Sequence, residues 1–273
     1  MASENAWMNT YTTTYKPIKK RLDILLTEAG HFPSSEKARA AVMAGLVRLP
    51  HQLLDKPGIK LKELPKHLHI QKLCPYVSRG GLKLKKALET FKVEVNGVIC
   101  LDIGSSTGGF TDCLLQNGAK HIYAVDVGYG QLDWSLRNHP QVTSREKVNA
   151  RYLTSEDLYP EHSPKAQLAV MDVSFISILK ILPALFHLLA DDGYLVSLLK
   201  PQFEAEAHQN EKGIVKSAAV RLEVLERIQS KAPESGMYLH KVISSPIHGR
   251  GGNQEFLGVF YKYPPSEDYE IKI

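Results

Sequence analysis

The sequence has few cysteines and no long apolar runs, and these two shortages exclude several classes of protein. Its three cysteines, Cys74, Cys100 and Cys113, show no C-x-x-C spacing, so neither a disulfide framework nor a zinc site is predicted and no metal is expected. No apolar run approaches the roughly 20 residues of a membrane span. Residues 1–15 are polar and Thr-rich, without the apolar core of a secretory signal. We therefore expect a protein of the reducing cytoplasm, with no membrane partner.

Positive charge is confined to one part of the chain. Residues 1–75 hold 12 Lys and Arg against 6 Asp and Glu, a net charge of +6, whereas residues 76–273 carry −1. A basic segment of this kind suits a polyanion such as nucleic acid. On charge alone, a solvated basic face explains it equally well. The cations expected to bind RNA are Arg21, Lys37, Arg39, Arg48, Lys56 and Arg79.

The basic segment has the pattern of a small α+β module. Leucines at helical spacing predict a helix over 21–28, and a helix capped by Ser34 or Ser35 is expected over 36–44. A glycine follows each helix, and a strand is expected to begin at Leu46. The expected divisions of the chain are a mobile tail (1–19), this module with its linker (20–75), a larger domain (76–265) and a C-terminal tail (266–273).

From Tyr76 onward, strand and helix patterns alternate. This alternation predicts an α/β domain with a mostly parallel, doubly wound sheet that is covered on both faces. The last two strands are close together along the chain, so we expect them to pair antiparallel at one edge. Strands are predicted over 98–102, 121–126, 141–144, 167–172, 193–199, 237–244 and 255–261, and helices over 80–91, 109–117, 131–137, 176–190 and 218–233.

The most informative stretch is L-D-I-G-S-S-T-G-G-F, residues 101–110. An apolar strand leads into an acid and a glycine-rich turn, and the next strand ends in a second acid. In nucleotide-binding domains, such glycines let the backbone approach the ligand, and the later carboxylate binds ribose hydroxyls. The spacing G-x-x-x-G-G differs from the G-x-G-x-x-G that cradles a pyrophosphate, so a ligand with an adenosine and no phosphates, such as S-adenosylmethionine, fits. The residues expected to bind it are Asp102, Gly104, Ser105, Ser106, Gly108, Gly109, Phe110, Asp126, Asn149 and Asp172.

Two more predicted strands end in charged residues. Asp172 opens the segment D-V-S-F, and Lys200 opens K-P-Q-F-E. Functional residues of a doubly wound sheet gather at these carboxyl ends, and an unpaired lysine is costly to bury there. We therefore expect a strand-end carboxylate beside Lys200. A helix cap at Asp172 and a surface lysine at Lys200 are the plainer interpretations.

Two loops contribute further candidates. The segment S-R-G-G-L-K places Lys83 at the start of a helix, where the helix dipole disfavours a cation. A functional role accounts for that placement, and a solvent-facing lysine is the alternative. The segment G-R-G-G-N-Q-E leads to Glu255 at the beginning of the last strand, which is also an ordinary position for an edge-strand acid.

Taken in order, Lys83, Asp172, Lys200 and Glu255 resemble the Lys-Asp-Lys-Glu tetrad of the FtsJ-like ribose 2′-O-methyltransferases. The resemblance is closer still to the TlyA family, historically labelled haemolysin A, which joins an N-terminal S-four RNA-binding domain to an FtsJ-like domain. It is carried by Y-V-S-R-G-G-L-K-L, Y-A-V-D-V-G-Y-G-Q-L-D-W and L-K-P-Q-F-E, and by R-L-D-x-L-L in the S-four part.

This resemblance implies a Rossmann-like fold and methylation of a ribose 2′-hydroxyl in ribosomal RNA or ribosomal subunits, with S-adenosylmethionine as cofactor. The four tetrad residues are then catalytic. Lys200 is the candidate base and Asp172 fixes its position, while Lys83 and Glu255 hold the hydroxyl and Lys200 in register.

The chain departs from the family in its loops, and two other functions stay open. An Asn-Gly-type turn usually follows the first S-four strand, whereas this chain has Pro50, which lacks a backbone donor, so we expect an altered hairpin. Residues 205–216 hold fewer glycines than the family's loop. The alternatives are an RNA-binding protein with a non-catalytic methyltransferase fold and a membrane-active haemolysin. The segment D-V-S-F, in place of an N/D-P-P-Y-like strand end, disfavours methylation of a base amine.

Overall fold

The computed structural model describes residues 18–71, 74–266 and 271. The chain divides into two compact units between Leu73 and Cys74, and each unit has a hydrophobic core of its own. Most of the two expected tails (1–19 and 266–273) and the centre of the expected linker lie outside the described residues.

The N-terminal unit consists of two helices and short strands. Helices α1 (Leu22–Glu28) and α2 (Ser35–Met43) confirm the two predicted helices. Of the two candidate caps, Ser34 is the one used, because its side chain accepts a hydrogen bond from the backbone N of Lys37. The short strands are β1 (Lys20–Arg21), β2 (Val47–Leu49), β3 (Gln52–Leu53), β4 (Lys60–Leu61) and β5 (His69–Ile70).

The segment around Pro50 forms a tight hairpin. Leu49 of β2 pairs with Gln52 of β3, so the turn consists of Pro50 and His51 alone. The missing donor of Pro50 therefore falls in the turn and outside the ladder of hydrogen bonds. The hairpin therefore forms with Pro50 in its turn, and the expected difference from the family's Asn-Gly-type turn stays a prediction.

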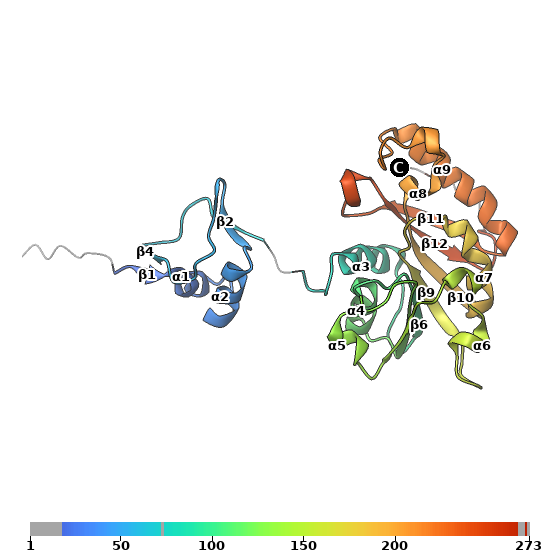
Figure 1. The fold of residues 1–273 in the computed structure, drawn as a ribbon, viewed down its shortest axis with the longest axis horizontal. Coiled ribbons are helices and arrows are strands. Elements are labelled where there is room, and N and C mark those ends of the chain that lie inside the picture. Colours follow the sequence, from blue (N-terminus) through green and yellow to red (C-terminus); the bar gives the residue numbers. More distant parts are fainter. Residues whose placement is uncertain (1–17, 72–73, 267–270, 272–273) are drawn as a thin grey trace, which may run out of the picture. The chain divides into compact units, whose positions relative to one another are not determined.

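The C-terminal unit is built on a seven-stranded sheet with the order β11-β12-β10-β9-β6-β7-β8 (Figure 1). Neighbours from β10 to β8 are parallel, and β12 is antiparallel to both β10 and β11. The predicted antiparallel pair at one edge is confirmed. The strands are β6 (Ile99–Ile103), β7 (His121–Asp126), β8 (Val142–Glu146), β9 (Ala166–Met171), β10 (Leu189–Leu199), β11 (Tyr238–Ser244) and β12 (Phe256–Tyr261).

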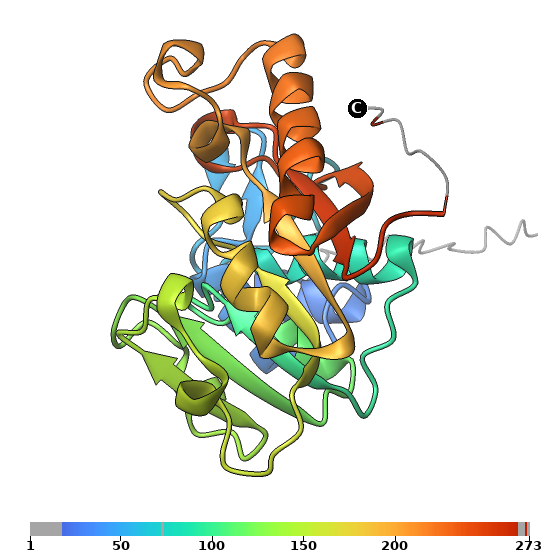
Figure 2. The same ribbon diagram turned by 90° about the vertical axis from the view of Figure 1, so that its right-hand side faces the viewer.

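Helices cover both faces of this sheet, as the alternating pattern predicts. In Figure 1, α3, α4 and α5 lie on one side, and α6, α7 and α9 lie on the other; Figure 2 looks onto α7 and α9 with the sheet behind them. The helices are α3 (Gly80–Phe91), α4 (Gly109–Gln116), α5 (Trp134–Arg137), α6 (Ser155–Leu158), α7 (Leu182–Leu188), α8 (Pro201–Glu204) and α9 (Ala218–Lys231), with 3₁₀ turns η1 (Ala150–Tyr152), η2 (Ile178–Lys180), η3 (Ala207–Gln209), η4 (Ala232–Ser235) and η5 (Arg250–Gly252).

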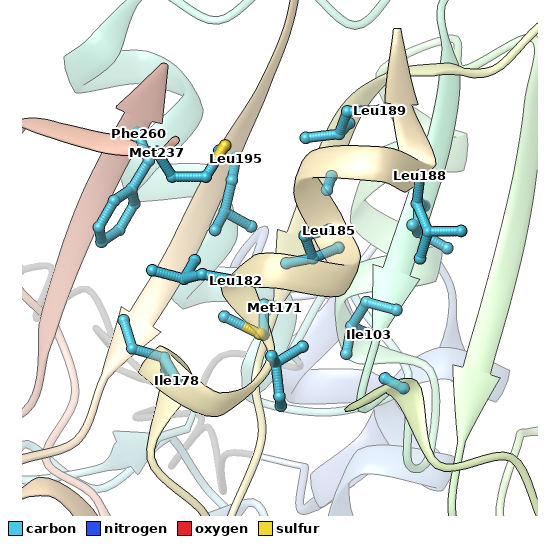
Figure 3. Packing of buried hydrophobic residues seen from close by; sticks show 14 of the residues in the cluster. Ile103, Met171, Ile178, Leu182, Leu185, Leu188, Leu189, Leu195, Met237 and Phe260 are labelled. Carbon is cyan, nitrogen blue, oxygen red and sulfur yellow. The ribbon is translucent and has the colours of Figure 1, made fainter. Parts of the chain in front are cut away.

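The helix expected over 176–190 is broken, and this corrects the prediction. Helix α7 begins only after η2, with Pro183 in its first turn, where the missing N–H of proline is tolerated. Leu189 already belongs to β10, which starts earlier than expected. Leu182 and Leu185 are fully buried and pack in the core beneath the sheet (Figure 3).

Candidate active site

Asp126, at the end of β7, holds the glycine-rich loop. Its Oδ2 accepts a hydrogen bond from the backbone N of Ser106 at 2.7 Å, and its Oδ1 accepts one from the backbone N of Gly128 at 2.6 Å. A Cβ at Gly104 would lie 2.6 Å from the carbonyl oxygen of Asp172, so the loop packs directly on the end of the neighbouring strand. The loop and the acid that the sequence pattern links are adjacent in the structure.

Asp102 is completely buried beneath this loop. Its Oδ2 accepts a hydrogen bond from Thr111 Oγ1 at 2.6 Å, and no described residue donates one to Oδ1. Burial, reinforced by the charges of Asp172 and Asp126, raises the pKa of Asp102 to about 7, although the hydrogen bonds from Thr111 oppose the rise. Through Thr111, Asp102 contacts the first turn of α4. The expected contact of Asp102 with the ligand stays a prediction.

Replacing Asp102 with asparagine is expected to make stability less dependent on pH. An unfolded aspartate loses its proton near pH 4, whereas folded Asp102 keeps it until about pH 7. The folded state binds the extra proton in this window, so the free energy of unfolding falls as the pH rises from 4 to 7, by at most about 4 kcal/mol. Urea unfolding across this range measures the effect. Parallel curves for the wild type and Asp102→Asn would contradict the raised pKa.

Two lysine–carboxylate pairs lie at the edge of the sheet where β9 and β10 end and β12 begins. Lys200 Nζ lies 2.5 Å from Asp172 Oδ1 and donates a hydrogen bond to Ser174 Oγ at 2.9 Å. Lys83 Nζ, in the first turns of α3, donates to Glu255 Oε2 at 2.6 Å. The Lys83 and Glu255 side chains are only 12% and 3% exposed. Water therefore screens this second pair poorly, and separating its ions is unfavourable.

The antiparallel last strand brings these pairs together. Leu199 of β10 is paired with Phe256 of β12, so the residues just outside this pair, Lys200 and Glu255, stand at the same edge of the sheet. Helix α3 packs against β12 and carries Lys83 to Glu255. Neither Asp172 nor Lys200 acts as a helix cap through its side chain, since the side chain of Ser177 caps the following 3₁₀ turn.

Two adjoining cavities open at this edge. The tetrad cavity has a volume of about 590 Å³ and is lined by all four residues of the predicted tetrad. The Asp126 cavity has a volume of about 400 Å³ and is lined by Asp126 and Asn149. A ligand can therefore extend from one cavity into the other. Their common wall consists of Gly104, Ser106, Asp172, Ser174 and Phe175.

Most of the residues predicted to bind the ligand line one of these cavities. Gly108 does not: it lies at a φ of +96°, and a Cβ there would lie 2.3 Å from a methyl carbon of Leu136, so this glycine serves the loop's backbone and packing. Those that do line a cavity are Gly104, Ser105, Ser106, Gly109, Phe110, Asp126, Asn149 and Asp172.

The cations predicted to bind RNA fall in both units. Arg79 belongs to the C-terminal unit and lines the tetrad cavity. Arg21 is bound to the nearly buried Asp23, with Nη2 2.6 Å from Oδ2, and this ion pair is part of the fold of the N-terminal unit. The other four predicted cations are exposed on that unit: Lys37, Arg39, Arg48 and Lys56.

Several residues of the tetrad cavity are absent from the sequence prediction. Phe175 is 85% exposed at a φ of +64°, and its ring centre lies 4.9 Å from that of Phe203. Both belong to segments that carry tetrad residues, D-V-S-F and K-P-Q-F-E. Their closeness in sequence to Asp172 and Lys200 is therefore the feature from which they could have been predicted. The other unpredicted residues include Ser78, Ser174, Gln202, His248 and Arg250.

The strand order, with one antiparallel strand inserted at an edge, and the glycine-rich loop followed by an acid define the Rossmann-like fold of the S-adenosylmethionine-dependent methyltransferases. Within that class, the chain belongs to the FtsJ-like methyltransferase family, whose sequence profile matches residues 76–262.

Relatives extend this likeness over most of the chain. A Bacillus subtilis protein provisionally named rRNA methyltransferase YqxC is 49% identical, covering 88% of this chain and 84% of that protein. The Mycobacterium tuberculosis 16S/23S rRNA (cytidine-2′-O)-methyltransferase TlyA is 39% identical, covering 87% and 88%. The solved structure of a provisionally named hemolysin from Streptococcus thermophilus is 44% identical, with a TM-score of 0.69, and covers 90% of this chain and 89% of that one. Among the described residues, no helix has the length and apolar character needed to cross a membrane.

Proposed function

We propose that the protein transfers a methyl group from S-adenosylmethionine to a ribose 2′-hydroxyl of ribosomal RNA. The observation that carries this proposal is that two lysine–carboxylate pairs line one cavity, which adjoins the cavity beside Asp126. The relative from M. tuberculosis is named for 2′-O-methylation of rRNA. We infer that the protein acts in the cytoplasm, where its RNA substrate lies.

The Asp126 cavity suits the adenosine part of the cofactor. Asp126 and Asn149 offer acceptors for ribose and base, and the apolar side chains of Val125 and Val148 line the same cavity. The cofactor supplies an activated methyl group on a sulfonium. The shared wall at Gly104 and Asp172 lets that group reach the tetrad cavity.

The tetrad then acts on the ribose hydroxyl. Lys200 Nζ, once it has released its own proton to solvent, would take the hydroxyl proton as the ribose oxygen attacks the methyl group that the cofactor would supply. Asp172, 2.5 Å from Nζ, stabilises the ammonium that results. Lys83 and Glu255 hold the hydroxyl in line with the methyl group, and much of the acceleration comes from this orientation.

The remaining residues of the tetrad cavity suit an RNA strand. Arg79, His248 and Arg250 place cationic or titratable groups in its wall, where phosphates can pair with them. Phe175 exposes an aromatic face on which a base can stack. The N-terminal unit, as an S-four domain, supplies further cations.

Removing three cations from the N-terminal unit is expected to flatten the salt dependence of RNA binding. In Lys37→Ala/Arg39→Ala/Arg48→Ala, each lost phosphate contact lowers the slope of log K against log salt by about 0.7 to 0.9, or roughly 2 in total. Filter binding to ribosomal RNA measures this slope. Salt concentrations between about 50 and 300 mM are of the order that resolves such slopes. Lys86→Ala/Lys120→Ala/Lys241→Ala, an equal loss of exposed charge from the C-terminal unit, is the control. Equal slopes for the two variants would contradict the assignment.

The direct test of the function is incubation with labelled S-adenosylmethionine and ribosomal RNA or subunits, followed by mapping of 2′-O-methylated nucleotides. We expect label at a ribose oxygen and calorimetric binding of the cofactor. Label on a base would contradict the proposed acceptor. Cofactor binding without transfer to any ribosomal substrate would favour a non-catalytic RNA-binding protein instead.

A further inference from the structure

Gln202 contacts one of the two ion pairs of the tetrad cavity and lies close in sequence to the other. It belongs to α8, two residues after Lys200, and is 8% exposed in the wall of the cavity. Its Nε2 donates a hydrogen bond to Glu255 Oε1 at 2.9 Å, while Lys83 donates to Glu255 Oε2 at 2.6 Å. The two oxygens of one carboxylate are thus held by two different helices, α8 and α3.

The amide of Gln202 is placed at a cost to stability. Its N–H side must face Glu255, because an amide oxygen in that position would repel the carboxylate. Its Oε1 is then buried, and no residue in the described part of the chain donates a hydrogen bond to it. A buried acceptor without a donor lowers the free energy of unfolding. Packing alone therefore does not explain a glutamine at this position.

The backbone closes on the same carboxylate from another side. A Cβ built on Gly249 would lie 2.1 Å from Glu255 Oε1, so no side chain fits there while Glu255 keeps its position. The position of the Glu255 carboxylate is therefore fixed by Gln202, Lys83 and Gly249 together.

We propose that Gln202 is a positioning residue for methyl transfer. Gln202 and Lys200 belong to the same strand-to-helix turn, so the amide sets the place of Glu255, and through it that of Lys83, relative to Lys200 and its partner Asp172. This inference rests on the proposed function. A misplacement of about 1 Å can slow a reaction roughly 100-fold, and we expect Gln202→Ala to lower the single-turnover rate constant by about that factor. Because Gln202 does not line the Asp126 cavity, the affinity for S-adenosylmethionine stays within a few-fold of wild type.

A second variant, Gln202→Glu, tests position through charge. This variant keeps the length of the side chain but places a carboxyl group about 3 Å from Glu255. Two carboxyl groups at so short a distance share a proton at low pH, and they repel each other once that proton is lost. The ratio of variant to wild-type rate is therefore expected to fall as the pH rises from about 4 to 9, a range that includes the upper pKa of a carboxylate dyad, about 4.7, and that of a buried glutamic acid, about 8–9. The other charged or titratable groups lining this cavity are Lys83, Asp172, Lys200, His248, Arg250 and Arg79. These groups are present in both proteins, so dividing the rate of the variant by that of the wild type removes the pH dependence that they give to the wild-type rate.

The experiment measures single-turnover transfer from labelled S-adenosylmethionine to ribosomal subunits, with calorimetry and thermal melts, for the full chain and its variants. Gln209→Ala is the matched control, because its amide also donates to a carboxylate, Glu223 Oε2 at 3.0 Å, but lies outside the cavity. A large rate loss in Gln202→Ala with cofactor affinity kept, and a falling ratio for Gln202→Glu, support the proposal.

Three outcomes overturn it. Absence of transfer by the wild-type protein removes the proposed function and this inference with it, whereas equal transfer by the wild type and Gln202→Ala removes the inference alone. A rate loss matched by loss of cofactor affinity, with a pH-independent ratio for Gln202→Glu, is the pattern of a merely structural residue. If Gln202→Ala does not fold, the pH dependence of the Gln202→Glu ratio decides.

Discussion

Lys200→Ala is expected to lower the single-turnover rate constant of methyl transfer by about 10²- to 10⁴-fold, the range that a positioned general base contributes. Lys200→Arg should fail as well, because a guanidinium stays protonated and cannot accept the hydroxyl proton. Lys200 lines the tetrad cavity and is absent from the Asp126 cavity, so cofactor affinity should survive both changes. Rapid-quench assays on ribosomal subunits, with calorimetry alongside, separate the two effects.

A lysine outside the cavities provides the control for Lys200. Lys180 lies on the 3₁₀ turn that follows the Asp172 loop, is exposed, and lines neither cavity. Lys180→Ala is expected to transfer methyl groups at the wild-type rate. Near-normal transfer by Lys200→Ala would remove the catalytic assignment. Near-normal transfer by Lys200→Arg alone would leave Lys200 with a purely electrostatic role.

Breaking the Lys83–Glu255 pair is expected to have the largest effect on stability. In Lys83→Met the buried Glu255 carboxylate keeps the amide of Gln202 but loses its cation, and removing one partner of a buried pair typically costs about 3–5 kcal/mol of unfolding free energy. Adding Glu255→Gln removes the uncompensated charge, so we expect the double variant to regain most of the loss. Urea unfolding gives these values.

Activity should not follow stability in this series. Both Lys83→Met and Lys83→Met/Glu255→Gln are expected to lose methyl transfer, because neither holds the ribose hydroxyl in line. Lys85→Met is the matched control: Lys85 is on the same helix and pairs with Glu89 at 3.7 Å, but both side chains are more than half exposed, where ion pairs contribute little. Recovery of transfer in the stable double variant would show that the pair serves the fold alone.

The sheet could be predicted from the sequence because its central strands are apolar runs that are buried on both faces. The helix over 176–190 could not, because the leucine pattern passes without interruption through Pro183 and into Leu189. The spacing of apolar residues does not show where a helix ends and a strand begins when both elements bury the same type of residue.

The tetrad could be predicted as a set of residues, but its supports could not. Asp102 and Asp126 look alike as strand-end acids, yet Asp102 is still inside β6, facing Thr111 in the core, whereas Asp126 is the last residue of β7 and reaches the loop. The hydrogen bond from Gln202 to Glu255 joins residues 53 positions apart. It exists because β12 inserts between β10 and β11, and sequence spacing gives no sign of that order.

The insertion of β12 also has a consequence for the synthesis of the protein. Translation delivers the chain from the N-terminus, so the cofactor loop, Asp172 and Lys200 leave the ribosome while Glu255 is still to be made. The last strand pairs with β10 on one side and β11 on the other (Figure 1), and β11 has no other strand partner among the described residues, so this edge of the sheet is completed only when β12 is present. A nascent chain can therefore fold much of its sheet and still lack a complete tetrad. A chain that has not yet reached Glu255 holds Lys83, Asp172 and Lys200 but lacks the fourth residue of the tetrad, and we expect a product truncated before Glu255 to be inactive.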